Sequence, residues 1–384
     1  HVVLVDQATR HASFSSVIAA ADDSTATKNA VAAPEPAGWR QRPKPRPRAF
    51  VRPVVIAALL LFVILAFPSI FSLYFLDAWT QVAIYSIVAL GLGLLVGRVG
   101  MVSLGQGAVL AMGAWVAARL LFATALPFPV ALLGAGLITM VLGTLVGLPA
   151  LRMSGLYLAL ITLMLAGAIT VALATINFPN GGHGFTGYDG GSVHIPAIRR
   201  PSIATTDPAF FRYSVVVGIL MFLLVLAHIR GRPGRAWAAI RQSESAALAA
   251  GINTTLYKLW AFALASFVTG VAGGLVAGSF RYLNSLTFAT ADSITLLAVV
   301  LMGGAYSMWG AIIAAVLLKF LQALLNDWGI SSDWLTILFG IGVLQVLTTA
   351  PRGLVDQVPK DLARLGGLLH GLLGRAASPG GQTE

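Results

Sequence analysis

The sequence predicts an all-α polytopic membrane protein: a bundle of about nine transmembrane segments, with a broken or re-entrant helix near residues 293–310. Three observations support this fold class. Hydrophobic residues make up 57% of the 384 residues and charged residues only 10%, against about 25% in soluble domains. Apolar residues come in runs of about 20, the length that crosses a bilayer. Finally, the charged residues between Pro53 and Thr175 are only Asp77, Arg98, Arg119 and Arg152.

The apolar runs favour helices over a β-barrel, because polar and apolar residues do not alternate along them. A helix also satisfies every backbone polar group within the span. Within a predicted transmembrane domain of residues 50–350, the expected spans are 54–76, 80–97, 101–123, 128–150, 154–176, 211–229, 256–279, 293–320 and 333–349. Small residues at four-residue spacing indicate close helix packing: Gly93/Gly97, Gly143/Gly147 and Gly270/Gly274/Gly278.

Residues 1–49 are predicted to form a disordered basic tail. They are rich in Ala, Ser, Thr, Pro and charge, a composition that cannot bury a core. The basic residues before the first span either bind anionic lipid headgroups or set the orientation of that span. We favour the second interpretation, which places the N-terminus in the cytoplasm.

Alternation from a cytoplasmic N-terminus gives the predicted topology. It places the loop 177–210 outside and the basic loop 230–255 in the cytoplasm. Beyond residue 280 two full spans would leave the basic tail 351–384 outside, although we expect that tail in the cytoplasm. We therefore expect 293–302 to dip into the membrane and return as a half-helix. Three basic residues on the outer side oppose the scheme: Arg199, Arg200 and Arg212.

Residues 97–107 form a glycine-rich break at the start of a hydrophobic segment, with Ser103 and Gln106 as its polar side chains. A helix that begins inside the membrane would direct free N–H groups and a partial positive charge at a polar solute. The alternative is a tight turn between helices, in which Ser103 caps the next helix. The pattern favours neither interpretation.

Residues 234–253 predict a cytoplasmic helix, because they are rich in alanine and end at Gly251, a natural stop. Trp237, Ile240 and Leu248 would lie near one face, and Arg241 and Glu244 on another. The helix is too short and polar to span a membrane. It either rests on the lipid surface or fits a groove on a cytoplasmic partner, and the pattern alone slightly favours the lipid surface.

Two further segments are rich in glycine. Residues 182–187 formally match the dinucleotide pattern G-x-G-x-x-G, but no strand precedes them, so we expect an external loop that forms a gate or a docking surface. Residues 301–311 interrupt a long apolar segment at Gly303 and Gly304, as in the broken helices of transport sites. A close-packed kink is the alternative.

The sequence argues against catalysis, since it has no catalytic motif, no Walker phosphate loop and no cysteine. We expect no metal site, because the six histidines are scattered, and no nucleic-acid partner, because the net charge of +11 lies between apolar runs. Ion-coupled secondary transporters usually bury an ionisable residue in mid-span. The acidic residues here lie near predicted span ends: Asp77, Asp292, Asp327 and Asp333.

Five ordered motifs resemble those of the permease subunits of branched-chain amino acid ABC importers, closer to the M-type subunit than to its companion. The resemblance covers about residues 91–354. GMVSLGQGA at 100–108 is similar to G-x-x-S-L-G-(H/Q)-x-A, and residues 151–163 to L-R-x-x-G-x-Y-F-A-x-x-T-L. Residues 181–184 are similar to G-G-x-x-G-L, residues 234–252 to the coupling loop G-R-x-x-x-A-I-R-x-x-E-x-A-A-x-x-x-G-I, and residues 300–310 to V-L-G-G-x-G-S-x-x-G. The departures from these patterns are Leu158, Phe185, Met302 and Tyr306.

The resemblance implies a subunit of the bacterial inner membrane that works with two cytoplasmic ATPases, a second homologous permease and an external solute-binding protein. The chain would hold no cofactor, and ATP and Mg would be used by the ATPases. The resemblance shifts the preference for 234–253 from the lipid surface to docking on an ATPase. Its implied contacts are Arg235, Trp237, Ile240, Arg241, Glu244 and Gly251, with Trp237 and Ile240 as buried anchors. The implied translocation path includes Ser103, Gln106, Tyr157, Thr162, Gly303 and Gly304.

Relatives in the same family import urea and short amides, and nothing in the sequence separates these substrates from branched-chain amino acids. An ion-coupled secondary transporter is the alternative from a different class. A membrane-embedded enzyme is disfavoured by the missing catalytic set.

Overall fold

The computed structural model describes residues 60–124, 126–150, 155–175, 198–280, 283, 288–331, 333–349 and 354–355. The chain divides into residues 1–61 and 62–384, and the helices of the bundle belong to the second unit. The predicted tail 1–49, the motif at 181–184 and most of the tail 351–384 lie outside the described residues.

Every regular element within the described residues is a helix, so the chain has the predicted fold of an all-α polytopic membrane protein. Six of these helices are long and apolar enough to cross a membrane, and shorter apolar helices cover 157–173, 290–303 and 337–346.

The first described helices differ from the predicted spans 54–76 and 80–97. Helix α3 (Phe67–Ile70) ends at Phe71, and α4 (Leu73–Gly93) begins after Ser72, whose backbone is extended. Asp77 therefore lies inside a helix, although the sequence predicts a boundary beside it. The π-helix η2 (Leu94–Val99) continues α4 and ends at Gly100, where φ is 85°.

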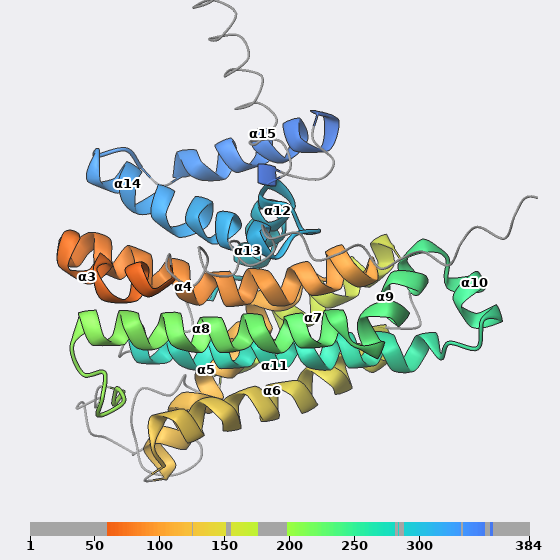
Figure 1. Cartoon of the computed structure of the whole chain (residues 1–384), viewed down its shortest axis with the longest axis horizontal. Helices are drawn as coiled ribbons and strands as arrows, with labels where there is room; N and C mark the ends of the chain where they lie inside the picture. The colour runs from red at the N-terminus through yellow and green to blue at the C-terminus, as the bar shows by residue number, and fades with distance from the viewer. Residues whose placement is uncertain are drawn as a thin grey trace, which may run out of the picture. The chain divides into compact units, whose positions relative to one another are not determined.

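The middle of the chain follows the predicted spans within a few residues. It contains α5 (Gln106–Ala123), α6 (Phe128–Ala150), α7 (Leu156–Thr175), α8 (Asp207–Arg230) and α11 (Thr254–Phe280). The helix α11 is largely buried and packs against α4, α5, α6 and α8, as Figure 1 shows for its course beside α8.

Small residues allow α11 to approach its neighbours closely. A Cβ on Gly113 would overlap the backbone of Gly270, and a Cβ on Gly273 would overlap the carbonyl oxygen of Leu110. This confirms the close packing predicted from the spacing of small residues around Gly270.

The predicted segment 293–320 is two helices. Helix α12 (Thr290–Gly303) ends at Gly304, whose φ of 110° is accessible mainly to glycine. The chain resumes as α13 (Met308–Ala315), η4 (Val316–Phe320) and α14 (Leu321–Asp327), and α15 (Asp333–Thr349) follows. The predicted break at Gly303 and Gly304 is confirmed. With 14 residues α12 measures about 21 Å, which is shorter than a full span.

Candidate functional site

The segment 230–255 forms two short helices at the end of the bundle where α8 ends and α11 begins (Figure 1). Helix α9 (Arg232–Gln242) and helix α10 (Glu244–Ala249) meet at Ser243, whose backbone is extended. The Ser243 side chain accepts a hydrogen bond from the Ala246 N–H at 3.3 Å. The predicted single helix is therefore broken, because Ser243 caps a new helix instead of continuing the old one.

Trp237 fixes α9 to the bundle. Its side chain is fully buried, and its indole N–H donates a 2.8 Å hydrogen bond to the carbonyl oxygen of Tyr257 on α11. Ile240 is also buried. Both residues are buried by their own chain, so the structure does not show them as contacts for a partner, and that implied role stays a prediction. They position α9, whereas Leu248, which helical spacing places on the same face, is 56% exposed.

Glu244 pairs with Lys258 and not with its sequence neighbour Arg241. Glu244 Oε1 lies 2.6 Å from Lys258 Nζ, since the break at Ser243 removes the helical spacing that would bring Glu244 beside Arg241. At the other end of α10, Gly251 has a φ of 79°, and the Ile252 N–H bonds back to the carbonyl of Ala247 at 3.0 Å. Gly251 thus ends the helix as predicted.

Arg241 connects α9 to the π-helix η2 and to the break after Gly304. Its Nη1 donates a 2.5 Å hydrogen bond to the carbonyl oxygen of Gly97, inside η2. Its guanidinium also lies 4.3 Å from the ring centroid of Tyr306, just after the break at Gly304. Gly97 itself faces this break, because a Cβ there would overlap the carbonyl of Ala305. We name Arg241, Gly97, Gly304 and Tyr306 the joint.

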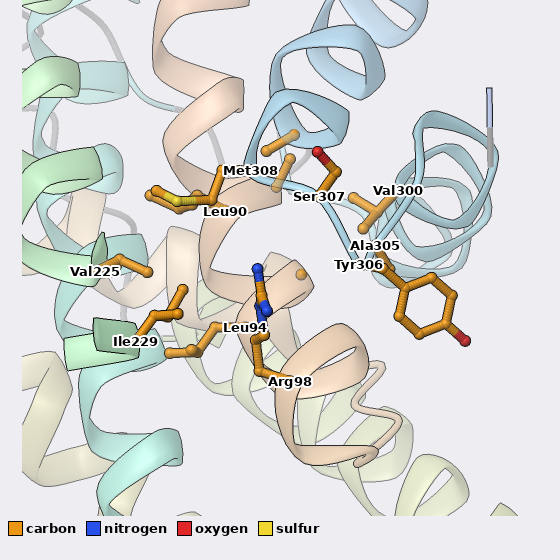
Figure 2. Close-up of a pocket in the computed structure, with 13 residues that line it drawn as sticks. Leu90, Leu94, Arg98, Val225, Ile229, Val300, Ala305, Tyr306, Ser307 and Met308 are labelled. Carbon is orange, nitrogen blue, oxygen red and sulfur yellow. The ribbon is translucent and has the colours of Figure 1, made fainter. Parts of the chain in front are cut away.

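The glycines of the joint are tightly packed against the opposite side of the break. A Cβ on Gly303 or Gly310 would overlap backbone atoms of the other side of the break. The gap beside it measures about 20 Å³ and is lined by Arg98, Ser307 and apolar side chains of α4 and α8. Figure 2 shows the Tyr306 ring turned away from Arg98 and this gap. Gly303 and Gly304 thus pack closely inside the break and do not line this gap, and their place on the translocation path stays a prediction.

A larger hollow adjoins α9. It measures about 610 Å³ and is lined by three basic residues, Arg98, Arg235 and Arg241, together with Gln242 and Ala238. Their positive charge suits an acidic or carbonyl-rich surface.

The residues predicted around 97–107 come together as a turn. The Leu104 N–H donates a 2.9 Å hydrogen bond to Thr162 Oγ1, and the Gly105 N–H bonds more weakly to Ser103 Oγ at 3.4 Å. Ser103 and Thr162 are both buried. They hold the turn before α5, as the structural interpretation predicts, although Ser103 bonds to Gly105 and makes no helix cap.

Gln106 and Tyr157 have different surroundings from Ser103 and Thr162. Gln106 is buried beside Gly91 and Thr269, and its Nε2 has no hydrogen-bond partner among the described residues. Tyr157 is 70% exposed, on the surface of α7. No residue predicted for the path lines the gap at the joint or the hollow beside α9. Gly97 and Tyr306 were not predicted from the sequence as partners of Arg241. Both positions were noticeable in the sequence, Gly97 through its four-residue spacing from Gly93 and Tyr306 through its departure from the family motif.

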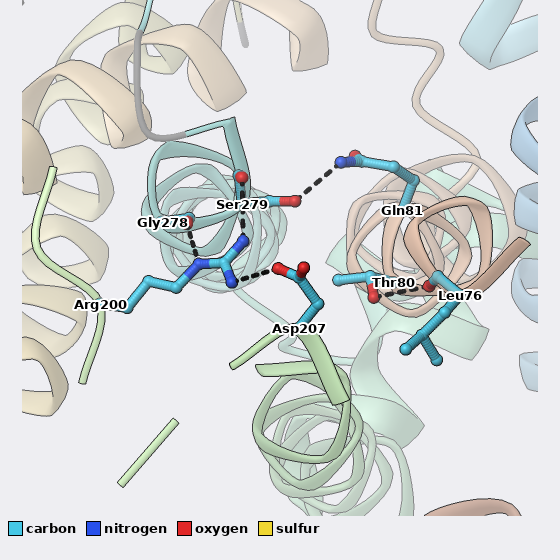
Figure 3. A network of polar contacts seen from close by, with 7 residues as sticks. All are labelled: Leu76, Thr80, Gln81, Arg200, Asp207, Gly278 and Ser279. Carbon is cyan, nitrogen blue, oxygen red and sulfur yellow. Dashed lines mark hydrogen bonds and ion pairs between the residues drawn. The ribbon is translucent and has the colours of Figure 1, made fainter. Parts of the chain in front are cut away.

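The opposite end of the bundle carries a second arginine cluster, which we name the clamp: Arg200, Asp207, Gly278 and Ser279. Arg200 donates to the carbonyl oxygens of Gly278 at 3.0 Å and Ser279 at 3.3 Å, at the end of α11. Its Nη1 lies 2.5 Å from Asp207 Oδ1 in the first turn of α8. Figure 3 shows Arg200 reaching both helices, and Gln81 of α4 joining through Ser279. Arg200, which opposed the predicted topology, is thus engaged in capping a helix.

Known proteins are similar to this chain over most of its length. The family described as branched-chain amino acid transport system, permease component, matches residues 74–347. The high-affinity branched-chain amino acid transport system permease protein LivM of Salmonella typhimurium is 32% identical over 334 residues, which cover 81% of this chain and 77% of that protein. LivM of Escherichia coli (strain K12) is 31% identical over 330 residues, with the same shares of 81% and 77%.

A more distant relative has another name. The ribose import permease protein RbsC of Haemophilus influenzae is 24% identical over 308 residues, which cover 77% of this chain and 90% of that protein. No solved structure matches the chain at comparable significance.

Proposed function

This chain belongs to the family of permease components of branched-chain amino acid transport systems, and from that membership we propose that it is the membrane-spanning subunit of an ATP-driven importer. An external solute-binding protein delivers branched-chain amino acids to it. Two cytoplasmic ATPases and a second homologous permease complete the assembly. The N-terminus and the α9–α10 end face the cytoplasm.

The connection through Arg241 is the observation that supports this function most strongly. An ATPase that docks on the exposed side of α9 and α10 meets Arg235, Gln242 and Glu244, with the basic hollow beside them. Trp237 and Arg241 tie α9 to α11, η2 and Tyr306. Movement of α9 by the ATPase therefore reaches the break at Gly304, where a left-handed glycine separates two helices.

We expect this chain to change its helix arrangement during transport and not to catalyse a reaction. A π-helix such as η2 and a glycine break such as Gly304 are places where a bundle changes shape at low cost. Closure of the ATPases would rock the helices on either side of the joint between outward- and inward-open states. ATP and Mg would act in the ATPases, outside this chain.

Reconstitution tests this function. The chain is co-expressed with candidate ATPases and a second permease, placed in proteoliposomes with the binding protein, and assayed for uptake of leucine and urea. We expect leucine uptake that stops when ATP is withheld. Uptake of urea would keep the mechanism and change the substrate class. Uptake by the lone chain, driven by an ion gradient and indifferent to ATP, would contradict the importer.

A further inference from the structure

A further cavity lies between helices of the bundle and is not lined by α9. It measures about 230 Å³ and is formed by α4, α5, α12, η4, α14 and α15. At about 30 Å³ for each water, it has the volume of seven or eight waters. Such a space suits one small solute and not a peptide.

The walls of this cavity are of two kinds. One part is apolar and buried, and its large side chains are Leu110, Phe288, Leu296, Leu335 and Phe339. The polar part contains one carboxylate and one ammonium group, from Asp292 on α12 and Lys319 on η4. Thr295 and Gln322 add neutral hydrogen-bonding groups.

The two charged groups do not neutralise each other through a direct ion pair. Ion pairs in the described part of the chain join Arg200 to Asp207 and Lys258 to Glu244. Lys319 Nζ instead lies 4.1 Å from the ring centroid of Tyr85, which also lines the cavity. Lys319 lies within the candidate span Met308–Asp327, where a charged side chain is costly unless something pairs with it, and such residues mark solute paths in membrane proteins. Asp292 lies in the exposed first turn of α12 and brings the opposite charge to the same cavity.

We propose that this cavity, with Asp292 and Lys319 on its wall, binds a free zwitterionic amino acid during its passage. The inference rests on the proposed function, since it assumes that this chain transports a small solute. The α-ammonium group of the solute pairs with Asp292 and the α-carboxylate with Lys319. The aliphatic side chain then lies on Leu110, Leu296, Leu335 and Phe339.

This arrangement discriminates between substrate classes. A neutral solute such as urea, an amide or a sugar offers no charged group to either the carboxylate or the ammonium group. Sites that present polar groups reject solutes that cannot pair with them. A zwitterion with a branched aliphatic side chain pairs with the carboxylate and with the ammonium group, and it also contacts the apolar part of the wall. The cavity therefore favours branched-chain amino acids over the neutral alternatives.

The glycine-rich turn also contributes to this cavity. Gly107 lines it, and a Cβ at Gly107 would overlap the hydroxyl of Ser293, one residue after Asp292. Ser293 is buried, and its Oγ has no hydrogen-bond partner among the described residues. Glycine at this position thus lets α5 approach the first turn of α12 and holds the carboxylate-bearing turn at the cavity wall.

The test uses the assembled transporter in nanodiscs and in proteoliposomes. Weak occupancy is measured by saturation-transfer NMR on leucine without the binding protein, and uptake is measured with it. Asp292→Asn and Lys319→Gln each remove one charge, and Asp327→Asn is the matched control, because Asp327 does not line this cavity. We expect loss of saturation transfer and a rise of about tenfold in the KM for leucine uptake with both cavity variants. Asp327→Asn should behave as wild type.

Further variants keep the result interpretable if a neutral variant does not assemble. Asp292→Glu and Lys319→Arg preserve the charges and should retain most of the uptake. Leu335→Phe narrows the apolar wall without changing charge, and should reduce leucine uptake more than alanine uptake. Wild-type saturation transfer and KM in the two neutral variants, or unchanged leucine preference in Leu335→Phe if they do not assemble, would overturn this proposal.

The same assay separates the two proposals. A wild-type complex that imports no amino acid would refute the proposed substrate, whatever the variants do. A wild-type complex that imports leucine, with cavity variants that match it, would refute the cavity alone.

Discussion

An arginine side chain lies at each end of the bundle, but the two arginines make different contacts. In the clamp, Arg200 bonds to two carbonyl oxygens and one carboxylate and lies 4.6 Å from the ring centroid of Phe210. Its side chain is only 8% exposed. In the joint, Arg241 bonds to one carbonyl oxygen and one ring, and no carboxylate pairs with it among the described residues.

From this difference we expect a firmer attachment at the clamp than between α9 and the joint. The clamp satisfies the carbonyls at the end of α11 and fixes α8 to it, which favours a single arrangement. In the joint the glycines pack closely, but α9 is attached to η2 and Tyr306 through the exposed side chain of Arg241.

The largest expected effect comes from adding a methyl group inside the joint. In Gly97→Ala the new Cβ overlaps the carbonyl of Ala305, whereas in Gly93→Ala it meets the same carbonyl oxygen at an ordinary 3.5 Å. We expect Gly97→Ala to lower the free energy of unfolding by about 3 kcal/mol and to abolish uptake. Gly93→Ala is the matched control and should be as stable as wild type, as measured by thermal unfolding in detergent. Equal stability of the two variants would contradict the close packing of the joint.

The second largest effect is expected from a variant that removes the arginine of the clamp. Arg200→Ala leaves the carbonyls of Gly278 and Ser279 without their donor, and we expect a loss of about 2 kcal/mol in the free energy of unfolding. Arg200→Lys should recover only part of it, because an ammonium group cannot form the forked bonds. Arg199→Ala removes a neighbouring exposed charge and should change stability by less than about 0.5 kcal/mol. Similar losses in the Arg199 and Arg200 variants would show that net charge, not the clamp, stabilises this end.

Removing the Arg241 side chain should lower the rate of transport more than the free energy of unfolding. Arg241→Ala removes an exposed side chain with one hydrogen bond, so we expect about 1 kcal/mol of destabilisation or less. ATP-driven uptake should fall about tenfold while ATP hydrolysis continues, since about 1.4 kcal/mol of lost coupling gives that factor. Arg232→Ala, which removes an exposed charge from the same helix, is the control. Parallel loss of hydrolysis and uptake would instead assign Arg241 to ATPase docking.

The smallest effect concerns the surface pair of α10. Glu244 and Lys258 are partly exposed, so a double-mutant cycle of Glu244→Gln and Lys258→Met should give a coupling energy of about 0.2–1 kcal/mol. If the pair also orients α10 for the ATPase, co-purification of the ATPase weakens in both single variants. A coupling energy as large as that of the clamp would remove the contrast between the two ends.

The sequence predicted several of these features because their causes are local. Gly251 ends α10 and Gly304 interrupts α12 through positive φ angles, a property of glycine that a sequence displays directly. The buried face containing Trp237 and Ile240 also follows helical spacing. Spacing identifies which residues are buried but not which chain buries them, and in the structure their own chain does.

Pairing across the chain could not be predicted in the same way. Arg241 and Glu244 lie three residues apart, yet one bonds to Gly97 and the other to Lys258. Lys319 and Asp292 meet at one cavity because the chain turns back after Gly304, and no local pattern links them.

Composition and periodicity thus determined the membrane-spanning helical fold, most helix ends and the positions of the glycine breaks, since each depends on hydrophobic runs or on the backbone freedom of single residues. Only the tertiary structure decided which arginine is a clamp and which is a joint. Arg200 and Arg241 are chemically identical in the sequence. Their roles differ because helix packing surrounds one with two carbonyls and a carboxylate, and leaves the other at an exposed edge beside a break.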